Sequence, residues 1–154
     1  MKGESWSVRE AQWSIDCDDL LEVRGAVFIV EQGVDVSVER DGRDGECLHA
    51  IAEDSAGLPI GAGRISRGGK VGRIAVLGGW RGQGVGMAIM RELLRQAQHA
   101  GIWKTYLHSQ SSAAGFYLRF GYQPEGDEFL EANIPHMKMI RVVDGNEKTV
   151  GSGH

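Results

Sequence analysis

Apolar and polar residues alternate near the start of the chain, which is the pattern of a strand with one buried face. The apolar positions of this stretch are Trp6, Val8 and Ala11. We therefore expect a first strand over residues 5–13.

The next apolar residues follow at helical spacing. They form a stripe of Leu20, Val23, Val27 and Val30. This spacing predicts an amphipathic helix that ends near Gln32 and Gly33. Asp16 stands before the stripe and is expected to be the N-cap, with Asp18 and Asp19 in the positive first turn.

A polar and acidic segment, residues 33–46, predicts a loop that has room for a short helical turn and is long enough to be functional. Three apolar segments follow, separated by Gly-Leu-Pro and Arg-Gly-Gly-Lys turns. They predict a meander of antiparallel strands over residues 47–53, 60–66 and 70–77.

The loop GGWRGQGVG connects the third of these strands to a helix. The helix has Val85, Ile89, Leu93 and Ala97 on one face, and Gly101 is expected to end it. A strand over residues 103–109 comes next. Strand, loop, helix and strand form a βαβ unit, whose two strands must be parallel.

The last elements are shorter. Ser111 or Ser112 can cap a helix that runs to Phe120 and ends at Gly121, and strands are expected over residues 122–125 and 136–143. We expect one domain, residues 1–143, and a flexible tail, residues 144–154, which lacks an apolar pattern.

Composition restricts the class of protein. The chain has 154 residues, 42% of them hydrophobic, so it should fold. Its net charge of −4 argues against binding nucleic acid through a basic surface. No apolar run is long enough to span a membrane, no secretory leader is apparent, and there are two cysteines. These features favour a reduced, cytoplasmic protein.

The glycine loop carries the first chemical signal. The segment Arg81-Gly82-Gln83-Gly84-Val85-Gly86 stands where a strand gives way to a helix, and free backbone N–H groups there favour a phosphate. A dinucleotide motif would need glycine where Met87 stands, and a P-loop would need Gly-Lys followed by Ser or Thr. Neither pattern is present.

The same segment resembles the R-x-x-G-x-G motif of the GNAT acetyltransferases. Further along, QSSAAGFYLRFGY is similar to that family's N-x-x-A-x-x-F-Y-x-x-x-G-F element, with Gln110 in place of Asn and Tyr122 in place of Phe. VRGAVFIVEQ, ERDGRD and IPHMKM resemble the small-molecule branch of ElaA-like proteins and glyphosate N-acetyltransferase. The resemblance spans residues 24–139.

The resemblance implies a single α/β domain with a mixed, mostly antiparallel sheet flanked by helices and splayed near Ala75 and Ser109 for acetyl-CoA. Backbone amides over residues 75–77 would carry the acetyl group and the oxyanion, and the glycine loop would hold the pyrophosphate. The implied coenzyme-binding residues are Ile74, Ala75, Val76, Arg81, Gly82, Gln83, Gly84, Val85, Gly86, Met87 and Gln110. For Gln110, a polar cap at the strand end is an equal alternative.

Acyl transfer to an amine needs a base and a proton donor for the departing thiolate. His136, in a Pro-His-x-x-Met pattern, resembles the general base of this branch, and Tyr117 resembles the general acid. The alternatives are a buried structural histidine and a packing tyrosine. Lys138 within the motif departs from some relatives.

The acceptor side is defined less sharply. Glu31, Glu39, Asp41 and His49 form an acidic side, and Arg24 and Arg73 would offset it or bind a substrate carboxylate. Of these, the residues expected to bind substrate are Arg24, Glu31, His49 and Arg73. Cys17 and Cys47 are expected to be core residues, and the histidines lack the spacing of metal ligands.

The sequence therefore predicts an enzyme, an acetyl-CoA-dependent N-acetyltransferase that transfers acetyl directly to a primary amine of a small molecule. The alternatives are a non-catalytic acyl-CoA-binding or sensing module, and an acetyltransferase for peptide or protein amines. The acceptor, the acyl-chain preference and the oligomeric state do not follow from the sequence, although an exposed edge strand would allow a homodimer.

Overall fold

The computed structural model describes residues 5–143, so the predicted tail and residues 1–4 lie outside the described residues. The N-terminal half forms an antiparallel sheet in the order β1-β2-β3-β4. Its strands are β1 (Trp6–Ala11), β2 (Leu48–Asp54), β3 (Pro59–Ile65) and β4 (Val71–Val76). The first strand and the meander are confirmed, with ends shifted by one or two residues.

The C-terminal half forms a second sheet in the order β5-β8-β6, with β7 also paired to β8. Its strands are β5 (Lys104–Gln110), β6 (Gln123–Pro124), β7 (Phe129–Glu131) and β8 (Ile134–Val142). All its pairings are antiparallel. β7 was not predicted, and β8 begins before His136 because it pairs with β7 across a tight turn.

The helices differ from prediction at their ends. α1 (Trp13–Arg24) begins before Asp16, with Gln12 as its N-cap, and continues into a π-helical segment, residues 25–31. The Asp16 carboxylate, expected to cap the helix, instead accepts the Gln12 backbone N–H and a guanidinium bond from Arg9. The helix thus begins earlier because Asp16 acts from within the first turn.

The remaining helices are α2 (Val36–Glu39), α3 (Val85–His99) and α4 (Ala114–Leu118), with short 3₁₀ turns over Asp44–Glu46, Gly78–Trp80 and Ser111–Ala113. α2 lies within the segment expected to be a loop. Neither Ser111 nor Ser112 caps α4 through its side chain. Among the described residues, no helix is both long enough and apolar enough to cross a membrane.

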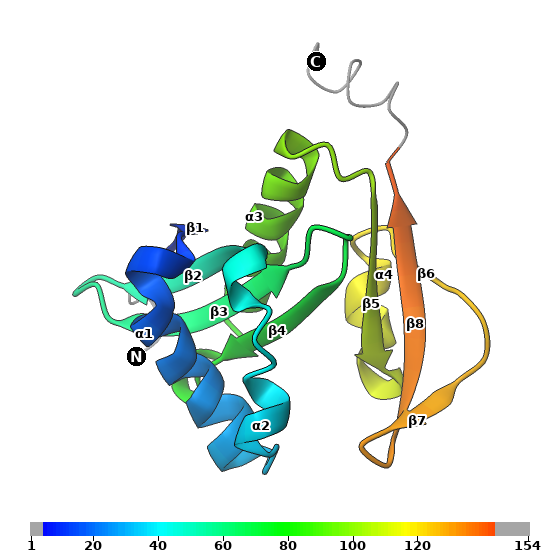
Figure 1. Ribbon diagram of the computed structural model, residues 1–154, viewed down its shortest axis with the longest axis horizontal. Helices are drawn as coiled ribbons and strands as arrows, with labels where there is room; N and C mark the ends of the chain where they lie inside the picture. The colour runs from blue at the N-terminus through cyan, green and yellow to red at the C-terminus, as the bar shows by residue number, and fades with distance from the viewer. Residues whose placement is uncertain (1–4, 144–154) are drawn as a thin grey trace.

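The two sheets meet where β4 begins. Lys70 and Tyr106 form a parallel bridge, and the Tyr106 N–H donates to the Gly69 carbonyl at 2.9 Å. Gly69 has φ +98°, and a Cβ there would collide with the Lys104 carbonyl. Beyond this point β4 and β5 diverge (Figure 1), so the βαβ unit and the predicted splay are both confirmed.

The core has two parts. α3 packs against the first sheet with Ile89 and Leu93, both fully buried, and this cluster continues to Leu107 and Met139 of the second sheet. α1 covers the opposite face of the first sheet, and its buried residues pack with Ile51. The first sheet therefore has a helix on each face, and the start of α3 lies at the end of β4 (Figure 1).

Candidate active site

A cavity of about 310 Å³ opens at the start of α3. One wall is the end of β4 and the glycine loop, and the other is α4. Its lining residues are Val76, Trp80, Arg81, Gly82, Gly84, Val85, Gly86, Met87, Phe116 and Arg119. Most of the residues expected to hold the coenzyme thus surround one cavity, while Ile74, Ala75, Gln83 and Gln110 are outside its lining.

The backbone at the start of α3 suits an anion. Gly84 is the N-cap in the left-handed region, with φ +87°, and the space where its Cβ would stand is open. The first N–H groups of a helix have no partner within the helix, and the helix dipole makes this end positive. A phosphate can therefore approach the backbone closely, and the residues present fit the coenzyme pyrophosphate.

Arg81 connects the glycine loop to the π-helical segment. Its two terminal nitrogens donate to the two Glu31 carboxylate oxygens, each at 2.8 Å, and its Nε donates to the Val76 carbonyl. The guanidinium lowers the pKa of Glu31, and the carboxylate raises the pKa of Arg81. Glu31, expected on the acceptor side, is thus paired with a residue of the glycine loop.

Among residues 5–143, no strand pairs with the outer edge of β4 beyond the bridge at Lys70. The Leu77 N–H donates to Ile60 of β3 at 2.9 Å, and Ala75 pairs with Ala62. Because strand residues alternate, the N–H and carbonyl of Val76 face away from β3, as its bond to Arg81 also requires. Val76 lies in the middle of the predicted backbone site, residues 75–77, and its N–H faces this edge.

Tyr117 lies on α4 next to the cavity. Its ring meets Phe116, which lines the cavity, edge-on at 5.0 Å between centroids. Within the described part of the chain its hydroxyl has no hydrogen-bond partner, and burial raises its pKa. The hydroxyl is therefore protonated at neutral pH and able to donate.

His136 lies on β8 opposite Gln110, the last residue of β5. It is 6% exposed, and its Nδ1 is 2.7 Å from the Ile134 carbonyl. A carbonyl only accepts, so Nδ1 carries the hydrogen and the neutral ring keeps its lone pair on Nε2. That nitrogen is 3.7 Å from a carboxylate oxygen of Glu131.

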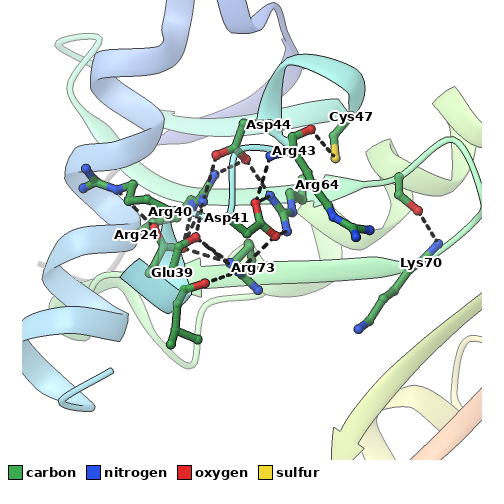
Figure 2. Close-up of polar contacts among 12 residues, drawn as sticks. Arg24, Glu39, Arg40, Asp41, Arg43, Asp44, Cys47, Arg64, Lys70 and Arg73 are labelled. Carbon is green, nitrogen blue, oxygen red and sulfur yellow. Dashed lines mark hydrogen bonds and ion pairs between the residues drawn. The ribbon is translucent and has the colours of Figure 1, made fainter. Parts of the chain in front are cut away.

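The acidic segment folds onto the first sheet through an ion network (Figure 2). Arg24 is 1% exposed and donates to Glu39 at 2.9 Å and to Asp44 at 2.7 Å. His49 is equally buried, with its Nε2 2.8 Å from the Asp44 carbonyl, and burial lowers its pKa. Arg24 and His49, expected to bind substrate, are thus engaged by protein groups.

Arg73 belongs to the same network but is partly exposed. Its guanidinium is 2.9 Å from the Glu39 carboxylate and also donates to the Val38 carbonyl. Arg64 joins from β3 and donates to Asp41 at 2.6 Å and to Asp44 at 2.8 Å. Figure 2 shows these side chains converging between α1 and the sheet, so the network anchors residues 36–46 beside β4.

The sequence matches a known protein family and several of its members. The acetyltransferase (GNAT) domain pattern matches residues 17–143. The chain belongs to the GNAT acetyltransferase family. It is 39% identical over 127 residues to the uncharacterized N-acetyltransferase YjcF of Bacillus subtilis, covering 80% of this chain and 90% of YjcF. It is 31% identical over 132 residues to protein ElaA of Escherichia coli, covering 80% of this chain and 86% of ElaA.

Solved structures agree. The crystal structure of Escherichia coli ElaA has a TM-score of 0.78 at 27% identity, covering 89% of this chain and 99% of that one. An acyl-CoA N-acyltransferase from Pseudomonas aeruginosa has a TM-score of 0.77 at 28% identity, covering 91% of this chain and 100% of that one. The predicted GNAT fold is confirmed. The chain is an acetyl-CoA-dependent N-acetyltransferase, and its acetyl donor is acetyl-CoA.

Four residues at the cavity or beside His136 were not predicted from the sequence. Trp80, Phe116 and Arg119 line the cavity, and Glu131 lies beside His136. Arg119 follows Tyr117 by two residues. Its positive charge, which suits an anion site, was the signal that could have indicated it. Glu131 carried no signal, because it stands in a polar stretch whose strand was not predicted.

The remaining candidate ligands and nucleophiles are histidines, acidic residues and two cysteines. Within residues 5–143 no group of three or more His, Cys, Asp or Glu side chains is arranged to hold a metal ion. Cys17 and Cys47 are free thiols, each half-buried rather than in the core as expected. Burial raises the pKa of Cys47, which opposes a role as nucleophile.

Proposed function

We propose that the chain transfers acetyl from acetyl-CoA directly to a primary amine of a small molecule, within a ternary complex. One observation carries the proposal: an anion site at the start of α3 adjoins the unpaired edge of β4. A pyrophosphate held by the glycine loop would direct the rest of the coenzyme along that edge. His136 and Tyr117 are our candidates for the proton transfers.

The bound coenzyme supplies a thioester carbonyl. As the amine nitrogen forms a bond to that carbon, His136 Nε2 removes a proton from the amine, since Nδ1 is engaged by Ile134. The Val76 N–H stabilises the developing negative charge on the oxygen. When the carbon–sulfur bond breaks, the Tyr117 hydroxyl gives its proton to the thiolate, and the resulting phenolate regains a proton from solvent. The products are an amide and a free thiol.

The two alternative functions predict different experimental results. A non-catalytic acyl-CoA-binding module would bind the coenzyme but release no thiol with any amine. A peptide or protein acetyltransferase would act on peptides and not on small amines. The test is therefore a thiol-release screen over amino acids, polyamines, aminoglycosides and peptides, together with the coenzyme affinity.

His136→Asn keeps a polar side chain but removes the base. We expect turnover to fall by on the order of a hundredfold, because general base catalysis contributes on the order of 10²–10⁴-fold. Acetyl-CoA affinity should be nearly unchanged, since the glycine loop lies on another element. Calorimetry and a pH profile of turnover check this. A variant that keeps the acidic limb of the profile and most of the rate would place the base elsewhere.

A further inference from the structure

The hairpin of β7 and β8 brings two imidazoles to one carboxylate. The Glu131 Oε1 is 3.1 Å from His108 Nδ1, and its Oε2 is 3.7 Å from His136 Nε2. Phe129 contacts both rings as well, stacked on His136 at 6.1 Å and edge-on to His108 at 5.2 Å between centroids. A strand residue and its second neighbour share a face, so Phe129 and Glu131 hold the same pair of rings.

The backbone fixes this arrangement tightly. Glu131 and Ile134 are the last pair of the hairpin, closed by a two-residue turn. Both turn residues, Ala132 and Asn133, have positive φ, at 52° and 63°. Alanine is strained in this region, and such strain persists where surrounding contacts impose it. The turn thus places Glu131 next to the Ile134 carbonyl that binds His136.

We propose that Glu131 is a positioning residue for the base, with His108 holding its second oxygen; the proposal rests on the proposed function of His136. When Nε2 takes the amine proton, it becomes an N–H donor beside an ionised carboxylate. A small movement closes the 3.7 Å separation to a charge-assisted hydrogen bond. The proton then leaves to solvent, which reaches this carboxylate because it is 50% exposed.

Other charges near His136 do not replace Glu131. From β5 it faces the neutral Gln110, with His108 two residues earlier. On β8 itself, Lys138 is directed to Glu125 at 3.1 Å and lies over the Tyr106 ring. From β7, the Glu131 carboxylate approaches the Nε2 of His136. The one carboxylate that reaches both imidazoles among residues 5–143 is therefore Glu131.

The test compares Glu131→Gln and Glu131→Asp with Glu128→Gln. Glu128 is a matched control three residues earlier, exposed, with its carboxylate bonded to the Ser111 hydroxyl. We expect Glu131→Gln to lower turnover by about tenfold, part of the contribution of a general base. The acidic limb of the pH profile should move to lower pH, because the imidazolium loses its anionic partner. Glu131→Asp should restore much of the rate, and Glu128→Gln should match the original chain.

A second measurement needs no turnover. Nitrogen NMR of the imidazoles should show His108 with its hydrogen on Nδ1, where the carboxylate accepts it, and should show this preference lost in Glu131→Ala, which has no acceptor. An unchanged His108 tautomer would overturn the proposal, as would an unchanged pH profile. A raised acceptor KM with kcat unchanged would also overturn it, by making Glu131 an amine-binding group. If His136→Asn leaves turnover unchanged, His136 is not the base. The His108 tautomer then still shows whether Glu131 pairs with His108.

Discussion

Tyr117 and Tyr122 have rings 6.2 Å apart but different surroundings. The Tyr122 ring is fully buried, and its hydroxyl is 2.7 Å from the Thr105 hydroxyl. Burial raises the pKa of both tyrosines, so both are neutral at physiological pH. Of these two hydroxyls, only that of Tyr117 has no protein partner among the described residues, and the Tyr117 ring touches Phe116, which lines the cavity. The two tyrosines therefore allow a direct comparison between a hydroxyl that has a protein partner and one that has none.

Tyr117→Phe should lower turnover with little effect on stability, because it removes a hydroxyl that no protein group binds and keeps the ring. Tyr122→Phe should do the reverse. It loses the bond to Thr105, worth about 1 kcal/mol, and leaves turnover unchanged. Steady-state kinetics and denaturant unfolding of both variants test this contrast. Equal turnover for Tyr117→Phe and the original chain, with chemistry rate-limiting, would make Tyr117 a packing residue.

The start of α3 shows how an element creates a binding site. Gly84 must have a positive φ to turn the chain into the helix, and the open space above it faces the cavity. Two requirements, backbone conformation and ligand access, therefore coincide at one position. A substitution there changes both, and a control is needed to separate them.

Gly57 supplies that control. It has φ +83°, nothing lies within 4 Å of its would-be Cβ, and it stands in the turn between β2 and β3. We expect Gly84→Ala and Gly57→Ala to lower the free energy of unfolding by a similar amount, about 1 kcal/mol. Only Gly84→Ala should weaken acetyl-CoA binding, by about tenfold or more, because its methyl group obstructs the anion. Calorimetry measures the acetyl-CoA affinity of both variants. Equal affinities would contradict the assignment of the glycine loop as the pyrophosphate site.

Elements with strong patterns were predictable and those set by tertiary contacts were not. The β2–β4 meander and α3 follow from apolar periodicity and turn glycines, and their ends shift only slightly. β7 has three residues in a polar stretch, and its turn uses Ala132 and Asn133 rather than a glycine. Its pairing with β8 therefore had no local signal. The glycine loop was predictable as a motif, but the Arg81–Glu31 pair joins residues fifty positions apart and required the fold.

The ion network links parts of the chain that are distant in sequence. Arg24 of α1, Glu39 of α2 and Arg64 of β3 meet around Asp44. The hydrogen bond from Arg64 lowers the pKa of Asp41. Burial opposes ionisation of Asp44, but hydrogen bonds from Arg24 and Arg64 outweigh it and lower the pKa of Asp44 as well. The folded state therefore binds these protons less readily than the unfolded chain.

The stability should consequently depend on pH. Because the folded carboxyl pKa values are depressed, their contribution is present above the ordinary value of about 3.9 and is lost as pH falls below it. Arg24→Leu removes the fully buried cation between Glu39 and Asp44. Glu39 then keeps only partly exposed arginines as partners, and Asp44 keeps Arg64. The substitution should lower the free energy of unfolding at pH 7 by about 3 kcal/mol. The difference should narrow toward pH 3, where those carboxylates can be protonated.

The control is Arg95→Leu, which removes an arginine 50% exposed and paired with Glu92 on the surface of α3. Its effect should stay within about 1 kcal/mol at every pH. Denaturant unfolding at several pH values from 7 to 3 compares the two variants. An Arg24→Leu protein as stable as the original at pH 7 would show that the network does not stabilise the fold.

The bridge between Lys70 and Tyr106 joins the start of β4 to β5. Gly69 stands beside it, and a Cβ there would collide with the Lys104 carbonyl. Any side chain at Gly69 would therefore displace β5 from β4. Val76, which lines the cavity, follows Lys70 by six residues, so this displacement should change the width of the cavity from a residue outside its lining.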